Sequence, residues 1–221
     1  MTSLAADVLL LLIDDRTGEP VRPWPETLPV LAGAVLSELE MSGRITTDHA
    51  YSAGAVDRLR VRVKDGEPTG DDVLDRALAR LARSLWAPRA PKAVNKLISV
   101  IFRPLLRQLR TTGFLRKERI RRFGVFPATR WKPLRPEHRS GLLNELRAAV
   151  VAETPPVPRI NALIGLLASV QMVEPLVGWD FYRANRDAWT RTAGHVRGTW
   201  PVAAVFSHLA EYEATVGATG G

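Results

Sequence analysis

The sequence contains no cysteine, which excludes disulfide bonds, a thiol nucleophile and cysteine-ligated metal centres. It also lacks a long hydrophobic run. The apolar stretch at 8–13 is only six residues long, whereas a bilayer-spanning helix needs about 20. No basic segment precedes this stretch, as one would in a secretory signal peptide. We therefore expect a cytoplasmic protein without a membrane span.

Catalytic motifs are missing as well. The chain lacks the His-Glu-x-x-His zinc motif, the Gly-x-Ser-x-Gly nucleophile elbow and a glycine-rich phosphate loop, and its four histidines are dispersed. The adjacent carboxylates at 14–15 and 71–72 are expected to form a turn and a helix cap, because neighbouring side chains point apart. We therefore predict a protein that is not an enzyme, has no metal site and needs no cofactor.

Basic residues are abundant and unevenly distributed. They outnumber acidic residues 31 to 23, for a net charge of +8. Residues 84–136 contain fourteen basic residues and a single acid, Glu118, so this segment carries +13 and the rest of the chain −5. Such asymmetry indicates a polyanionic partner, which could be nucleic acid, an anionic membrane or an acidic protein surface. A solvated basic face without a dedicated ligand gives the same pattern.

The hydrophobic spacing predicts a mainly α fold, with residues 1–221 forming a single compact helical domain. Helical periodicity occurs over 28–45, 71–81, 93–112, 136–151 and 159–173, with further helix after 179. Closely spaced prolines from Pro20 to Pro29 predict a loop with Trp24 in its middle, and alternation over 58–64 predicts a short strand. Residues 217–221 are expected to form a flexible tail.

The helix expected at 93–112 has a cationic face. At about 100° per residue, its cations fall within a stripe roughly 60° wide, opposite a face of leucine and isoleucine. The stripe consists of Lys96, Arg103, Arg107 and Arg110. Pro104 removes one backbone hydrogen bond, so a kink or a new helix start at this position is also open. Cations on one side and core residues on the other suit phosphate binding.

A basic β-hairpin is expected to protrude from the helical domain at about 117–132. Cations beside apolar and aromatic residues are typical of an interfacial membrane anchor, and four cations near an anionic surface contribute about 1 kcal/mol each. We predict membrane contact by Arg121, Arg122, Phe123, Val125 and Phe126. Inward packing of the three apolar side chains is the alternative. A helix followed by a basic hairpin also fits a winged-helix nucleic-acid-binding protein, although the apolar tip favours lipid.

Several motifs occur in a characteristic order along almost the whole chain. They are 7–12 followed by Asp15-Arg16-Thr17-Gly18, 31–39 followed by Gly43-Arg44-Ile45, Pro68-Thr69-Gly70-Asp71 followed by 74–78, Thr112-Gly113-Phe114-Leu115 before the hairpin, and 159–173. In this order they resemble the Golgi phosphoprotein 3 family, which has members in eukaryotes and in many actinobacteria. The resemblance implies a mostly helical domain with a protruding hairpin that is associated with membrane contact and oligomer formation.

The same resemblance implies a function. Eukaryotic members are peripheral membrane proteins that recognise phosphatidylinositol 4-phosphate and hold glycosyltransferases in place. Trp24 matches the tryptophan of the family's lipid pocket, whereas the positions of the pocket's basic residues hold Ala32, Ser99 and Phe102. We predict a headgroup site formed by Trp24, Arg103, Arg107 and Arg110, with the arginines assigned from charge alone. The expected partner is an anionic membrane lipid. A homo-oligomer and a protein partner are further expectations, with an interaction scaffold as another alternative.

Overall fold

The computed structural model describes residues 2–52, 54–122, 126–152, 156–196 and 199–219. Its elements are mainly helical, as the hydrophobic spacing predicts. The helices are α1 (Leu4–Leu12), α2 (Trp24–Met41), the 3₁₀ turn η1 (Val56–Arg58), α3 (Asp72–Ala82), α4 (Ala90–Thr111), α5 (Pro136–Val151), α6 (Pro158–Ser169), α7 (Val173–Val177), α8 (Trp179–Ala184), α9 (Arg186–Val196) and α10 (Trp200–Thr219). The strands are β1 (Ile45–Thr47), β2 (Val61–Val63), β3 (Leu115–Arg122) and β4 (Phe126–Pro133).

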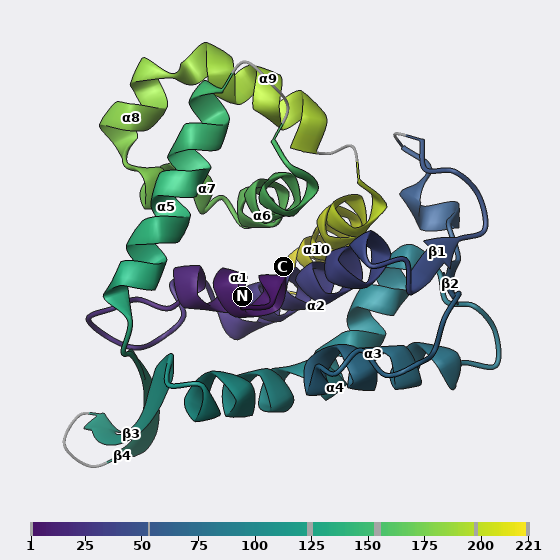
Figure 1. Cartoon of the computed structure of the whole chain (residues 1–221), viewed down its shortest axis with the longest axis horizontal. Coiled ribbons are helices and arrows are strands. Elements are labelled where there is room, and N and C mark those ends of the chain that lie inside the picture. The colour runs from purple at the N-terminus through teal and green to yellow at the C-terminus, as the bar shows by residue number, and fades with distance from the viewer. Residues whose placement is uncertain (1, 53, 123–125, 153–155, 197–198, 220–221) are drawn as a thin grey trace.

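Helix α2 is the centre of the packing. It contacts α1, α4, α6 and α10, and Figure 1 shows α1 and α2 between α6 on one side and α3 and α4 on the other. Every residue of α1 is buried, which explains why the apolar run at 8–13 shows no polar face. Burial of this kind, at about 25 cal/mol per Å² of apolar surface, is the main stabilising contribution to the fold.

Helices α3 and α4 form one edge of the molecule, opposite α8 and α9 (Figure 1). Asp71 begins α3, because its carboxylate accepts hydrogen bonds from the backbone N–H groups of Val73 (2.8 Å) and Leu74 (3.1 Å). The apolar face of α3 then packs against α4. Gly113, with φ of +73°, ends α4 in the left-handed conformation and turns the chain into β3.

The predicted hairpin is confirmed and is slightly longer than expected. Strands β3 and β4 pair antiparallel from Leu115 opposite Pro133 to Arg122 opposite Phe126. The pair extends away from the helices, at the end of α4 (Figure 1). A second, smaller antiparallel pair joins β1 to β2, and β2 accounts for the alternation seen over 58–64.

Proline positions account for most differences from the predicted elements. Trp24 begins α2 instead of lying in a loop. Pro25 occupies the first turn of the helix, where backbone N–H groups have no partner within the helix, so its missing N–H costs no hydrogen bond. Pro29 and Pro104 lie inside continuous helices. Both prolines are buried, so tertiary packing offsets the lost hydrogen bonds.

The C-terminal third contains more breaks than the periodicity indicates. Helix α6 ends at Ser169 and a separate short helix, α7, begins at Val173. A flexible tail was predicted from residue 217, but helix α10 continues to Thr219, so residues 217–219 are helical. Glycine alone does not end this helix, since an exposed helical glycine costs only about 1 kcal/mol.

Candidate functional site

Helix α4 presents five cations on one face. Because the helix is continuous through Pro104, Lys96 stays aligned with Arg103, Arg107 and Arg110. One turn earlier, Lys92 extends the same stripe, which the sequence analysis overlooked. Among the described residues none of the five forms an ion pair with an acid. The opposite face is buried and includes Leu97, Ile101, Leu105 and Leu109.

The two faces of the hairpin differ in charge. On one face Glu118 binds the guanidinium groups of Arg130 (2.6 Å) and Arg116 (2.9 Å). These hydrogen bonds, first from Arg130 and then from Arg116, hold the pKa of Glu118 below its usual range. Alternate positions of β3 carry Lys117, Arg119 and Arg121 on the other face. This second face carries three cations and no acid, whereas Glu118 offsets part of the charge on the first face.

The structure places part of the predicted membrane-contact tip. Arg121 is exposed in β3, and Arg122 pairs with Phe126 through the backbone at the last described position of the ladder. Phe123 and Val125 lie outside the described residues, as do the side chains of Arg122 and Phe126. Their contact with a membrane stays a prediction.

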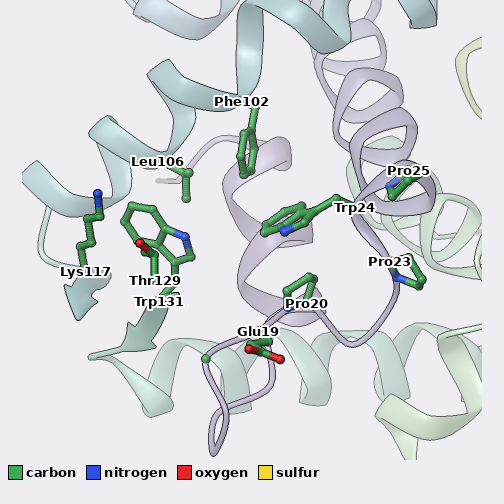
Figure 2. A pocket seen from close by; sticks show the side chains of 11 residues that line it. Glu19, Pro20, Pro23, Trp24, Pro25, Phe102, Leu106, Lys117, Thr129 and Trp131 are labelled. Carbon is green, nitrogen blue, oxygen red and sulfur yellow. The ribbon is translucent and has the colours of Figure 1, made fainter. Parts of the chain in front are cut away.

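An aromatic cavity of about 600 Å³ lies beside the hairpin. It is lined by Trp24 from α2, Phe102 from α4 and Trp131 from β4, together with Lys117, as Figure 2 shows. The rings of Trp24 and Phe102 meet edge to face, with 4.6 Å between their centroids and 63° between their planes. Phe102, at a position where the resemblance implies a basic residue, instead packs against Trp24.

The loop before α2 docks on the hairpin through Gly18. The backbone N–H of Trp131 donates to the carbonyl of Gly18 (2.9 Å), and Gly18 has φ of +65°. A Cβ here would lie 2.8 Å from the Trp131 carbonyl oxygen and would also overlap the side chain of Arg130. The turn itself is built by Asp14, whose carboxylate accepts from the backbone N–H of Thr17 (2.6 Å), which lowers the pKa of Asp14. Only glycine allows this close approach.

A second, cationic cavity of about 410 Å³ adjoins the first. Its lining combines cations with apolar side chains, namely Arg107, Arg110, Thr111, Leu115, Arg116, Lys117 and Leu134. Lys117 lines both cavities. The predicted headgroup residues are thus divided between two neighbouring cavities. Trp24 lines the aromatic one, Arg107 and Arg110 line the cationic one, and Arg103 lines neither.

Lys117 and Trp131 line the aromatic cavity, although neither was predicted as a site residue. Strand alternation places both on one face of the hairpin, directly opposite each other, so this signal could have indicated that they act together. Their meeting with Trp24 and Phe102 depends on how the loop, α4 and the hairpin pack. No local pattern encodes that arrangement.

A buried polar cluster fastens α1 to α5 and α6. The carboxylate of Asp7, 3% exposed, accepts from Thr2 Oγ1 (2.6 Å), lies 2.8 Å from His138 Nε2 and pairs with Arg159. Glu38 accepts from the backbone N–H of Leu4 (3.0 Å), and burial raises the pKa of Glu38. These groups satisfy one another, so the cluster stabilises the fold, and the apolar sequence around Asp7 gave no sign of it.

Membrane spans and metal clusters are both absent from the described residues. No helix in this part of the chain is both long and apolar enough to cross a bilayer. Over the same residues, His, Asp and Glu side chains form no group of three suited to a metal ion.

Comparison with known proteins gives one informative result. No curated protein matches the chain. The family model for Golgi phosphoprotein 3 (GPP34) matches residues 4–211, which include α1, the aromatic cavity, the cationic face of α4 and the hairpin. Since the match extends over nearly the entire sequence, the chain belongs to the Golgi phosphoprotein 3 family.

Proposed function

We propose that this protein is a non-catalytic peripheral membrane protein that binds anionic or phosphoinositide-type lipid through the cationic face of α4 and the adjoining hairpin. Family membership agrees with a lipid-binding or protein-interacting role. The observation that carries the proposal is the row of five cations on α4 without acidic partners among the described residues, continued by Lys117 on the hairpin. Such a row attracts anionic lipid at about 1 kcal/mol per cation.

The proposed place for a lipid phosphate is the cationic cavity. Arg107 and Arg110 are one helical turn apart and exposed, and Lys117 approaches the same cavity from β3. Leu134, which is 42% exposed, supplies apolar surface at its edge. Arginine forks bind phosphate oxygens in pairs, and the apolar edge suits the glycerol or acyl part of a lipid.

The aromatic cavity has a different character. The resemblance implies basic residues at three positions of the lipid pocket, and this chain has none of them. The positions hold Ala32, which is buried, Ser99, which is exposed, and Phe102, which packs on Trp24. Lys117 is its one cation among the described lining residues. We therefore propose that selectivity for phosphatidylinositol 4-phosphate over other anionic lipids is weak, and that charge dominates binding.

The test is co-sedimentation with vesicles. The protein is mixed with vesicles of phosphatidylcholine alone, with added phosphatidylglycerol, or with added phosphatidylinositol 4-phosphate at equal lipid charge. We expect sedimentation with both anionic mixtures and little with phosphatidylcholine. Raising the salt concentration should weaken binding, because exposed charges are screened over about 10 Å at 0.1 M.

The decisive variant carries Arg107→Glu and Arg110→Glu. Reversing two cations removes about 2 kcal/mol of attraction and adds about 2 kcal/mol of repulsion, so binding should fall by roughly a thousandfold. The matched control, Arg183→Glu with Arg186→Glu, makes the same charge change at exposed sites on α8 and α9. Equal binding by both variants would contradict the proposal. Binding to duplex DNA with a steep salt dependence, and none to vesicles, would favour the nucleic-acid alternative.

A further inference from the structure

The loop between α3 and α4 exposes two adjacent large apolar side chains. Leu85 is 90% exposed and Trp86 is 80% exposed, the highest values for large apolar side chains in the described part of the chain. Isolated surface apolar residues are common, but a neighbouring leucine and tryptophan held almost fully in water indicate a surface that another body covers.

The backbone on both sides of this pair is fixed. Before it, the N–H of Ser84 donates to the carbonyl of Leu81 (3.1 Å). After it, the guanidinium of Arg60 donates to the carbonyl of Ala87 (2.9 Å), and the N–H of Val61 donates to the carbonyl of Pro88 (2.8 Å). The two side chains are therefore presented by an anchored loop, so little conformational entropy is lost when a partner covers them.

The surroundings of the pair are cationic. No acid occurs between residues 76 and 117. The nearest basic side chains in sequence, Arg83 and Arg89, are exposed. Arg60, bound to the loop backbone, is exposed as well. Its backbone N–H donates to the carboxylate of Asp48 (2.8 Å), so the three arginines outnumber this acid three to one. Apolar tips flanked by cations match the boundary between phosphate headgroups and acyl chains of an anionic bilayer.

The loop and the hairpin lie at opposite ends of α4. The apolar pair comes just before the helix, whereas the hairpin follows its other end. A 22-residue helix is about 33 Å long. The row of cations on α4 thus lies between the loop that carries Leu85 and Trp86 and the hairpin. A helix held at two points about that far apart would lie along a surface instead of pointing into it.

We propose that Leu85 and Trp86 insert into the interfacial region of anionic bilayers as a second membrane contact, in addition to the hairpin. This inference rests on the proposed lipid-binding function. It adds a site of apolar insertion, which binding by charge alone would not need. Tryptophan favours this depth because its ring is apolar while its N–H can still reach water or headgroups.

The absence of native cysteine allows a direct test, since one introduced cysteine is labelled uniquely. Trp86→Cys is labelled with an environment-sensitive nitrobenzoxadiazole dye and mixed with phosphatidylglycerol vesicles. We expect a blue shift, increased emission and quenching by lipids that carry a nitroxide on the acyl chain. The matched control is Trp179→Cys, at a tryptophan that is 61% exposed and begins α8. Helix α8 lies at the edge of the molecule opposite α3 and α4 (Figure 1), so this label should not respond.

A second variant measures the contribution to affinity. Trp86→Asp should weaken partitioning into these vesicles about tenfold or more, while Trp179→Asp should leave it unchanged. Both sites are exposed, and unfolding curves verify that each variant folds.

The outcomes separate this inference from the function on which it rests. If the protein sediments with anionic vesicles but the label at position 86 does not respond, the insertion is refuted and the proposed function stands. If the protein does not sediment at all, both fail. A dye response that depends on protein concentration without vesicles would show that a second copy covers the loop, which also overturns the insertion.

Discussion

Replacing Gly18 by alanine tests whether the loop before α2 is held against the hairpin as the structure describes. Gly18 has φ of +65°, and its carbonyl accepts from Trp131 N–H. An added methyl group would lie 2.8 Å from the Trp131 carbonyl oxygen, which belongs to the backbone and cannot rotate away. The loop would have to leave β4, and the wall of the aromatic cavity would move with it.

The expected loss of stability has three parts. A left-handed alanine costs about 1–2 kcal/mol, the steric overlap about 1–3 kcal/mol and the weakened hydrogen bond about 1 kcal/mol. Gly18→Ala should therefore destabilise the protein by about 3–6 kcal/mol. Gly43→Ala is the matched control, because Gly43 has φ of +70° and a methyl group added there would meet no atom within 4 Å. It should cost only the backbone part, about 1–2 kcal/mol.

Urea unfolding measures both variants against the wild type, with the slope of the transition checked for constancy. Native-state quenching of tryptophan fluorescence by acrylamide provides a local readout. It should increase for Gly18→Ala alone, because Trp24 and Trp131 line the disturbed cavity. Equal losses of stability in the two variants would refute the proposed docking of the loop on the hairpin.

Three further outcomes follow from single contacts. Asp71→Ala should destabilise α3 by about 1 kcal/mol in urea unfolding, because two backbone N–H groups lose their acceptor. Asp72→Ala, at the exposed neighbouring position, should cost less. Arg159→Ala should cost about 3 kcal/mol by the same assay, since it removes the guanidinium partner of the buried Asp7 carboxylate, and a loss below about 1 kcal/mol would contradict this interpretation. The two ion pairs of Glu118 lower its pKa in the folded state. They therefore add stability at pH values above the usual pKa of this carboxyl group, 4.5. That stability is lost as pH falls through the lowered pKa. The stability difference between wild type and Glu118→Gln should therefore shrink on acidification, and a constant difference would count against these ion pairs.

Local pattern was sufficient for much of the fold. The period of the apolar residues predicted α3, α4 and α5, and the bounds of α5 agree with the structure. The alternation and charge of the segment after Gly113 predicted the hairpin. These elements are predictable because each has one face toward the core and one toward water, so burial imposes a repeat on the sequence. The prolines between Pro20 and Pro29 put the predicted start of α2 at 28 rather than at Trp24. Pro104 left a break in α4 open, and packing offsets its missing hydrogen bond.

Contacts between distant segments could not be predicted in this way. Asp7 lies more than a hundred residues before His138 and Arg159, which are on the successive helices α5 and α6, and no spacing links the three. The same holds for Trp24, Phe102 and Trp131, which come from three different elements. The sequence shows which residues these are, but it does not show that they contact one another in the folded protein.

The sequence by itself determined that the protein is mainly helical, that it lacks cysteine chemistry, and that one segment is strongly cationic with a stripe of charge along a helix. These properties depend on residue type and on the geometry of a single element. The tertiary structure decided that Lys117 joins two cavities, that Phe102 rather than a cation contacts Trp24, and that Leu85 and Trp86 are left in water. Each of these depends on how separate helices and strands pack, and packing is settled by the burial of all apolar faces together rather than by any one segment.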